Sequence, residues 1–252
     1  MRIAHISDIH FNFGTDFNEK VYEKAVKILN KINPDLVFIS GDITTDGLLS
    51  EYDLANEKLK EINFKQVVVP GNHDERNLGF KLFREFFGKT DFIKTFDQVN
   101  LVALSSSEPD KDDGRLGRGR HEFIERAIKK KNKMTFVGFH HHLVPVPNSG
   151  REANIIEDAG ETLDIILRNK IPLVLMGHRH VPWAVKIHKT LLVNAGTFSC
   201  NRTRAHLGNT FNVIDINKDI IEITVVNIRK EKFKKMIDFN TQNGFYLNKN
   251  YD

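Results

Sequence analysis

Side chains that can bind a metal ion or transfer a proton follow directly on a short apolar run of this chain. Three valines at residues 67–69 stop at Pro70-Gly71, and Asn72-His73-Asp74 come next. β-branched residues favour a strand, and a Pro-Gly step ends one sharply. We therefore expect Asn72 and His73 at the carboxyl end of a buried strand, held on a tight turn.

Other apolar runs end in the same way. Each is a candidate strand followed by histidine or aspartate: Asp8-Ile9-His10 after residues 2–7, Gly41-Asp42 after residues 36–39, His140-His141-His142 after residues 134–139, and Gly177-His178-Arg179-His180 after residues 172–176. Side chains two residues apart on a strand project from the same face, so Asp8 and His10 could reach one point in space. A single His-x-His at a strand end is more often a surface feature, but its repetition at several strand ends predicts one site.

Amphipathic helices between these runs must position the strand ends. Apolar residues recur with helical spacing over residues 21–32 and again over residues 50–62. The resulting order of strand, helix, strand, helix and strand predicts right-handed crossovers and a parallel sheet. Ligands of such sheets bind outside the carboxyl ends of the strands, so the polar residues should meet at one edge.

The predicted cluster has the composition of a metal site. Imidazole and carboxylate ligands with almost no sulfur suit Mn, Fe, Zn, Co or Ni better than Mg or Ca. The candidate ligands outnumber what one ion needs and fit two divalent ions that share a carboxylate. Such a pair would bind a phosphate anion and turn a bound water into hydroxide near neutral pH.

Composition limits the partners of the chain. Of its 252 residues 40% are hydrophobic and 28% charged, and the formal net charge is only +4, so no nucleic-acid partner is favoured. The single cysteine, Cys200, excludes an intramolecular disulfide and is interpreted as a buried apolar residue. No apolar run approaches the roughly 20 residues of a spanning helix, and no signal peptide is expected at the N-terminus. We expect a cytoplasmic protein, monomeric or homodimeric, that does not enter a membrane.

The domain organisation is expected to be simple. We found no internal repeat and no low-complexity linker in the sequence. Residues 1–230 should form one domain. The polar, Asn- and Lys-rich residues 231–252 should form a surface extension that packs poorly and is partly disordered.

In order and spacing, the five strand-end blocks resemble the signature blocks of the calcineurin-like metallophosphoesterases, and within that family the class III cyclic-nucleotide phosphodiesterases. The resemblance implies an α/β fold, a four-layer α/β/β/α sandwich of two mixed sheets flanked by helices. It also implies hydrolysis of cyclic nucleotides or other small phosphodiesters by a metal-bound hydroxide, with Mn or Fe as the favoured ions. Alternatives are a phosphomonoesterase or nuclease of the same superfamily and, in another class, a non-catalytic metal-binding scaffold.

The resemblance also implies roles for the individual residues. One ion would be held by Asp8, His10, Asp42 and His180, and the other by Asp42, Asn72, His178 and one histidine of residues 140–142. His141 is the preferred ligand and His140 the second choice. If His141 is the ligand, Leu143 replaces the proline that usually follows two residues later, and strand alternation also lets His140 or His142 face the site.

Substrate contacts are implied as well. His73 would touch the phosphate and protonate the leaving oxygen, and Asp74 would orient the His73 imidazole. Asn72, His140 and His142 would complete the substrate pocket. Five arginines could clamp a phosphate or a nucleotide, and surface ion pairing is the alternative for each: Arg115, Arg118, Arg120, Arg202 and Arg204.

Overall fold

The first of two β-sheets carries three of the strand ends that the sequence singles out. The computed structural model describes residues 1–96, 99–129, 133–151, 154–242 and 246–249. The first half of this sheet alternates with helices: β1 (Arg2–Ile6), α1 (Glu19–Ile32), β2 (Leu36–Ser40), α2 (Leu49–Leu59), β3 (Gln66–Val69) and α3 (Gly79–Phe87). β1, β2 and β3 pair in parallel, as the alternating order predicts.

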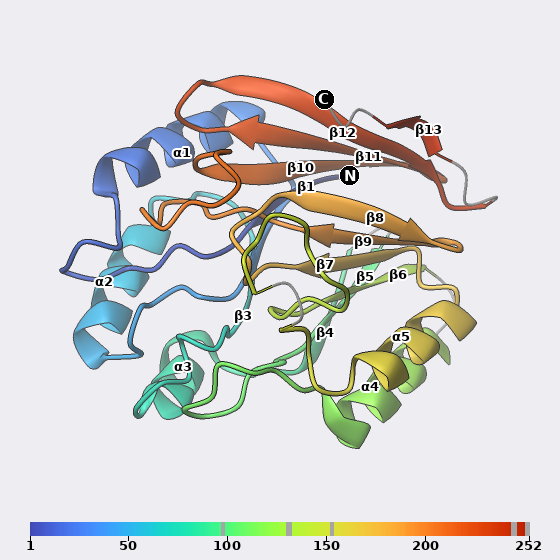
Figure 1. Ribbon diagram of the computed structural model, residues 1–252, viewed down its shortest axis with the longest axis horizontal. Helices are drawn as coiled ribbons and strands as arrows, with labels where there is room; N and C mark the ends of the chain where they lie inside the picture. Colours follow the sequence, from blue (N-terminus) through green and yellow to red (C-terminus); the bar gives the residue numbers. More distant parts are fainter. Residues whose placement is uncertain (97–98, 130–132, 152–153, 243–245, 250–252) are drawn as a thin grey trace.

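Four antiparallel strands extend this sheet beyond β1. They are β10 (Thr210–Asn217), β11 (Ile220–Asn227), β12 (Lys232–Asn240) and β13 (Tyr246–Lys249), and the sheet has the order β13-β12-β11-β10-β1-β2-β3. Figure 1 shows these late strands beside β1, so the last part of the described chain lies against its beginning.

The second sheet has the order β4-β5-β6-β7-β9-β8. Its elements are β4 (Phe92–Thr95), β5 (Val99–Ala103), α4 (Gly117–Lys129), β6 (Met134–Gly138), α5 (Ala159–Arg168), β7 (Leu173–Met176), β8 (Trp183–Ile187) and β9 (Thr190–Asn194). β5, β6, β7 and β9 pair in parallel, and β4 and β8 close the two edges antiparallel.

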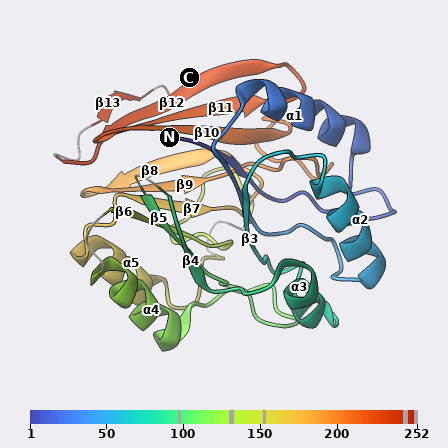
Figure 2. The ribbon, with the colours of Figure 1, turned by 180° about the vertical axis from the view of Figure 1, so that it is seen from behind.

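Three apolar cores separate four layers. The inner core joins the two sheets and contains, for example, Phe38 of β2 and Phe136 of β6. The outer cores pack α1–α3 on the first sheet and α4 and α5 on the second, and Figures 1 and 2 show α1 and α2 on one outer face and α4 and α5 on the other. The prediction of an α/β/β/α sandwich of two mixed sheets is therefore confirmed. None of the described helices is long and apolar enough to cross a membrane.

The C-terminal residues pack better than the sequence predicts. β12 pairs with β11 over its whole length, and its Ile237 and Phe239 are buried in the inner core. The expectation of a poorly packed extension from residue 231 is therefore corrected for residues 232–240. Their alternation of polar and apolar residues is that of a strand with one solvent-facing side. Residues 243–245 and 250–252 of the predicted extension lie outside the described residues.

Candidate metal centre

Loops at the carboxyl ends of strands in both sheets bring two groups of potential ligands together. The first group contains Asp8, His10, Asp42 and His180, and the second contains Asp42, His140 and His178. Within each group the ligand atoms all lie within 4.8 Å of one another. Asp42 belongs to both groups, so its carboxylate lies between them.

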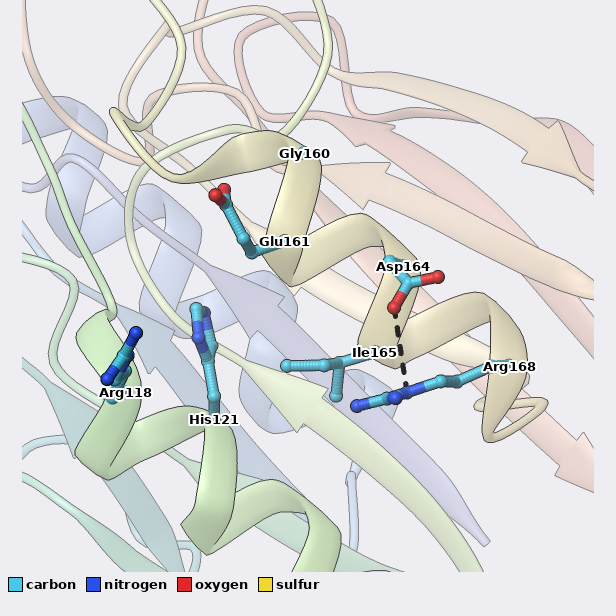
Figure 3. Close-up of a pocket in the computed structure, with 7 residues that line it drawn as sticks. All are labelled: Arg118, His121, Gly160, Glu161, Asp164, Ile165 and Arg168. Carbon is cyan, nitrogen blue, oxygen red and sulfur yellow. Dashed lines mark ion pairs between the residues drawn. The ribbon is translucent and has the colours of Figure 1, made fainter.

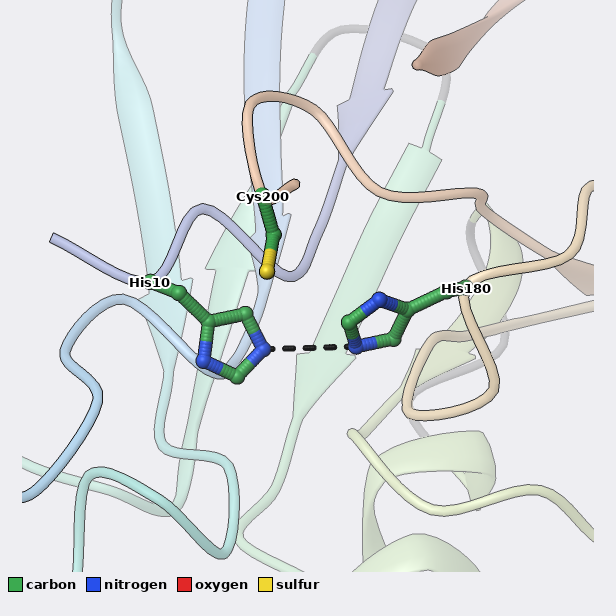
Figure 4. Close-up of side chains that lie close together, drawn as sticks. All are labelled: His10, His180 and Cys200. Carbon is green, nitrogen blue, oxygen red and sulfur yellow. Dashed lines mark hydrogen bonds between the residues drawn. The ribbon is translucent and has the colours of Figure 1, made fainter. Parts of the chain in front are cut away.

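The first group is built on the loops after β1, β2 and β7. His180 Nε2 lies 3.1 Å from Asp8 Oδ1, and His10 Nε2 lies 3.6 Å from Asp42 Oδ2. The two imidazoles face each other with their Nε2 atoms 3.3 Å apart, as Figure 4 shows. All four side chains are buried.

The second group is built on the loops after β2, β6 and β7, and Asn72 from the loop after β3 lies beside it. His140 Nε2 lies 3.3 Å from Asp42 Oδ2 and 3.2 Å from Asn72 Oδ1. His178 Nδ1 lies 3.2 Å from the same His140 nitrogen and 3.1 Å from Asn72 Oδ1. The Asn72 amide nitrogen donates to Asp112 Oδ1 at 3.1 Å, which turns the amide oxygen toward the group.

Backbone carbonyls fix the tautomers of two of these histidines. His140 Nδ1 donates to Ser40 O at 2.7 Å, and His180 Nδ1 donates to Arg202 O at 2.6 Å. A proton held on Nδ1 leaves the Nε2 lone pair for a cation, and this is the usual arrangement around metal-bound histidines. In both groups ring nitrogens approach each other beside a carboxylate, so the donor set fits a divalent ion.

Electrostatics couple Asp42 to its histidine neighbours. Burial alone would raise the pKa of Asp42, but His140, His73 and His10 hold this pKa well below its usual value. Burial opposes a charge on His140 too, yet Asp42 raises the pKa of His140 to about 9. Burial lowers the pKa of His10 and of His178 well below the ordinary value, which keeps both rings neutral and able to act as ligands.

The backbone of the centre is unusual. Five candidate ligands have left-handed backbone conformations, with φ of 54° at Asp8, 57° at His10, 52° at Asp42, 73° at His178 and 57° at His180. Each strand thus turns sharply where it reaches the centre. Gly71 allows a close approach of two of these loops, because a Cβ atom at this position would lie 2.2 Å from Asp42 Oδ1.

His141 is not part of either group, which corrects the sequence-based preference. Its Nδ1 lies 2.9 Å from Ser106 Oγ and its Nε2 lies 3.1 Å from the Asp112 carbonyl oxygen, so neighbours occupy both ring nitrogens. The structure places His140, the second choice, beside Asp42 instead. His142 is buried and its ring stacks on that of His178.

His73 and Asp74 also differ from the expectation. The Asp74 carboxylate accepts from the backbone nitrogens of Gly71, Ile43 and Thr44, so it does not orient the His73 ring. His73 Nδ1 donates instead to the Thr45 carbonyl oxygen at 2.6 Å. The structure thus gives the orienting role to a backbone carbonyl.

Sequence reasoning missed the contacts of three residues with the centre, although it named Arg202 as a candidate phosphate clamp. Cys200, interpreted as a buried apolar residue, has its sulfur within 4.8 Å of ligand nitrogens of His10 and His180 (Figure 4). Arg202 contributes its carbonyl to His180, and its Nη2 lies 3.2 Å from His10 Nδ1. Asp112 holds Asn72. All three come from long loops that carry no strand-end signal.

A cavity of about 400 Å³ opens onto both groups, with Asn72, His73 and His180 in its wall. This volume is in the range of small-molecule sites. A larger hollow of about 580 Å³ lies between α4 and α5 (Figure 3) and contains none of the candidate ligands. The chemistry therefore belongs to the smaller cavity.

Comparison with known proteins agrees with this geometry. A family model described as calcineurin-like phosphoesterase matches residues 1–182. A probable cyclic nucleotide phosphodiesterase of Xenorhabdus bovienii is 24% identical over 243 residues, which covers 87% of this chain and 97% of that protein. One of Synechococcus sp. is 26% identical over 60% of each chain, so this chain spans less than two thirds of that relative. A probable glycerophosphodiester phosphodiesterase of Arcobacter nitrofigilis is 26% identical over 78% of each chain.

Solved structures share the fold at low sequence identity. A purple acid phosphatase from yellow lupin seeds matches 93% of this chain and 52% of its own, with a TM-score of 0.75 and 15% identity. The protein GAP50, named as an anchor in the inner membrane complex of Plasmodium, matches 93% of this chain and 88% of its own, with a TM-score of 0.69 and 13% identity.

Proposed function

The chain belongs to the calcineurin-like phosphoesterase family and is a hydrolase of phosphoester bonds, and from this premise we propose that it hydrolyses small phosphodiesters with two divalent metal ions. The observation that carries the proposal is the pair of ligand groups that share Asp42. Relatives named as phosphodiesterases support a diester substrate, with cyclic nucleotides first and glycerophosphodiesters second.

The proposed ligands differ from the sequence-based expectation in one residue, since His140 takes the place of His141. Asp8, His10, Asp42 and His180 would hold one ion, and Asp42, Asn72, His140 and His178 would hold the other. Mn and Fe are the proposed ions, since histidine and carboxylate donors suit them. When bound, two such ions supply a nucleophilic water at neutral pH and charge stabilisation for the phosphoryl oxygens.

Residues of the chain itself would orient the ester and move the proton. Asn72 is a neutral amide, so it can join the centre without cancelling the positive charge that attracts a phosphate. His73 lines the cavity, and its Nδ1 is engaged by Thr45, so its Nε2 is left to exchange a proton with the leaving oxygen. The single cysteine of the chain fits the proposed cytoplasmic location.

The test is hydrolysis of bis(p-nitrophenyl) phosphate with Mn²⁺ or Fe²⁺, followed by cyclic nucleotides, a glycerophosphodiester and p-nitrophenyl phosphate. Asp42→Asn should lose bound metal and turnover together, because the carboxylate belongs to both groups. His73→Ala should lower kcat by about 10²–10⁴-fold with the metal content retained, as expected for a group that transfers a proton.

Asp164→Asn is the matched control, because Asp164 is an exposed carboxylate of α5 and pairs with Arg168 at 3.6 Å (Figure 3). It should keep wild-type metal content and turnover. Full metal occupancy in Asp42→Asn would contradict the shared role of Asp42. A wild-type protein loaded with metal that cleaves none of these esters would leave a metal-binding scaffold as the function.

A further inference from the structure

The cavity beside the candidate metal centre carries more positive charge than one phosphodiester needs. Five of the described residues in its wall are arginines: Arg76, Arg151, Arg179, Arg202 and Arg204. Two of these have carboxylate partners, since Arg76 pairs with Asp46 and Asp112, and Arg202 pairs with Asp16. A phosphodiester has a single negative charge, and Asn72, His73 and the proposed ions already account for its binding.

The remaining arginines form no ion pair among the described residues. Arg179 lies between two candidate ligands in the sequence and is only 4% exposed. Its Nη2 donates to the Ser149 carbonyl oxygen at 2.7 Å, and Arg204 Nη1 donates to the same oxygen. Arg151, two residues after Ser149 in the sequence, also lines the cavity. One neutral carbonyl thus holds two guanidinium groups side by side.

Holding the guanidinium groups of Arg179 and Arg204 together costs free energy unless an anion binds between them. A buried charge without an opposite charge loses its hydration and gains little in return, and two like charges repel each other as well. A phosphate group would compensate both, since guanidinium groups bind phosphate oxygens with paired, charge-assisted hydrogen bonds. A dianionic phosphate matches two or three guanidinium groups better than a carboxylate, which has one charge.

The loop around Ser149 is shaped to fit these guanidinium groups. Gly150 has a φ of +86°, and a Cβ atom at this position would lie 2.8 Å from Arg204 Nη1 and 3.7 Å from Arg179 Nη2. Ser149 is fully buried, and its Oγ donates to the Val146 carbonyl oxygen at 2.7 Å, which anchors the loop. The arginines are therefore held in place by a defined backbone and are not loose surface charges.

We propose that Arg179 and Arg204, with Arg151 at the rim, form a second phosphate subsite, so that the substrate carries another phosphate group in addition to the ester that is cleaved. This inference rests on the proposed function and narrows its substrate class. Plain cyclic nucleotides, which have one phosphate, would then be weaker substrates than phosphoesters with a second phosphate.

The test measures binding, so that it does not depend on turnover. Isothermal titration calorimetry of the Mn²⁺-loaded protein compares adenosine monophosphate with two ligands that add one phosphate at different distances, adenosine diphosphate and adenosine 3′,5′-bisphosphate. At least one of the two should bind about tenfold more tightly than the monophosphate, as one charge-assisted contact pair predicts. Arg204→Gln should abolish most of this preference, and Arg204→Lys should restore part of it.

Two further variants separate a built subsite from general attraction by positive charge. Gly150→Ala keeps every charge, but its added Cβ atom would displace the Arg204 guanidinium group. The preference for ligands with a second phosphate should therefore fall in this variant too. Arg168→Gln removes an arginine that already pairs with Glu125 and Asp164 on the far side of the fold, and it should keep the wild-type preference. Equal affinities for all three ligands in the wild type, or an undiminished preference in Arg204→Gln, would overturn the proposal. Hydrolysis of bis(p-nitrophenyl) phosphate reports separately on the proposed function.

Discussion

At the scale of single residues, the centre depends on which ring nitrogen of each histidine carries a proton. The carbonyl oxygens of Ser40, Thr45 and Arg202 accept from Nδ1 of His140, His73 and His180 respectively. Backbone carbonyls cannot change their identity by mutation, so they fix these tautomers more securely than side chains would. The Nε2 atoms are then all available for the chemistry.

Substitution of His140 and of His141 tests directly which of the two histidines is a metal ligand. His140→Ala should lose metal and turnover, because His140 Nε2 lies against Asp42 and Asn72. His141→Ala should keep its metal, because both ring nitrogens of His141 are occupied by Ser106 and Asp112. Elemental analysis of the two purified variants, with turnover of a diester, distinguishes them. Equal metal loss in both variants would contradict the assignment.

The sequence predicted the types of these residues but could not choose among residues 140–142. β6 ends at Gly138, so strand alternation no longer governs which way the three histidines point. Cys200 is a similar case, since its contact with the centre depends on a loop that pairs with Phe17, more than 180 positions away in the sequence. Such contacts leave no local pattern.

At the scale of elements, Asp74 connects the loops that follow β2 and β3. It accepts from Gly71 N at 2.8 Å, Ile43 N at 3.2 Å and Thr44 N at 2.8 Å, and also from Thr44 Oγ1 at 2.9 Å. These loops carry Asp42 on one side and Asn72 on the other. Asp74 therefore holds two parts of the centre at a fixed separation, which is a different role from the predicted contact with His73.

Asp74→Ala should destabilise the fold and loosen the centre. The substitution leaves three buried backbone N–H groups without an acceptor, and each costs about 1–3 kcal/mol, so the free energy of unfolding should fall by at least about 3 kcal/mol. Urea denaturation gives this value, and metal affinity measured on the same protein should fall as well. Unchanged stability and affinity would show that the two loops keep their positions without Asp74.

Glu75, the next residue, gives the same loop a pH-dependent stability. Burial raises the pKa of Glu75 from 4.5 to about 7, although Arg120 opposes the shift. The folded chain therefore keeps this proton up to about pH 7, whereas the unfolded chain releases it near its ordinary pKa. Between these values the folded state binds more protons, so the contribution of Glu75 to stability falls as the pH rises.

Glu75→Gln should remove this dependence. The stability of the wild type relative to the variant should fall by about 3 kcal/mol as the pH rises through this window, at about 1.4 kcal/mol per pKa unit. Urea denaturation of both proteins at several pH values measures the difference. A difference that stays constant, or that grows with pH, would contradict the raised pKa.

At the scale of the whole molecule, the centre joins the two sheets. Asp8, Asp42 and Asn72 come from the first sheet, and His140 and His178 come from the second. An ion bound to both sets would connect the two halves of the sandwich at one edge. Metal binding should therefore stabilise the fold as well as the site.

Addition of Mn²⁺ to metal-stripped protein should raise the unfolding temperature. Saturation at about 100 times the Kd adds about 3 kcal/mol, which corresponds to roughly 5–10 °C for a chain of this size. Differential scanning calorimetry with and without a chelator measures the shift. In Asp42→Asn the rise in unfolding temperature should be less than half of that in the wild type. An equal rise in the wild type and in the variant would place the ion elsewhere.

The alternation of strands and helices predicted the parallel strands of the first sheet, and the family resemblance implied the four-layer sandwich, but neither predicted the full extent of the first sheet. β12 has lysines where a buried strand would have apolar residues, because one of its faces meets solvent. Ile237 and Phe239 can be identified as core residues only once β12 is known to pair with β11. Pairing between strands is a property of the folded molecule, and a pattern along one segment reports it poorly.

The left-handed backbone at Asp8, His10, Asp42, His178 and His180 bears on how this chain can evolve. L-residues with a Cβ pay about 1 kcal/mol or more for such a conformation, and glycine or asparagine pays less. Selection for folding alone would thus favour glycine at these positions, and selection for chemistry keeps aspartate and histidine there. A descendant that lost its substrate should gain thermal stability as it lost its ligands. Relatives that keep the fold without activity would then be recognised by glycine at these five positions, which follow β1, β2 and β7.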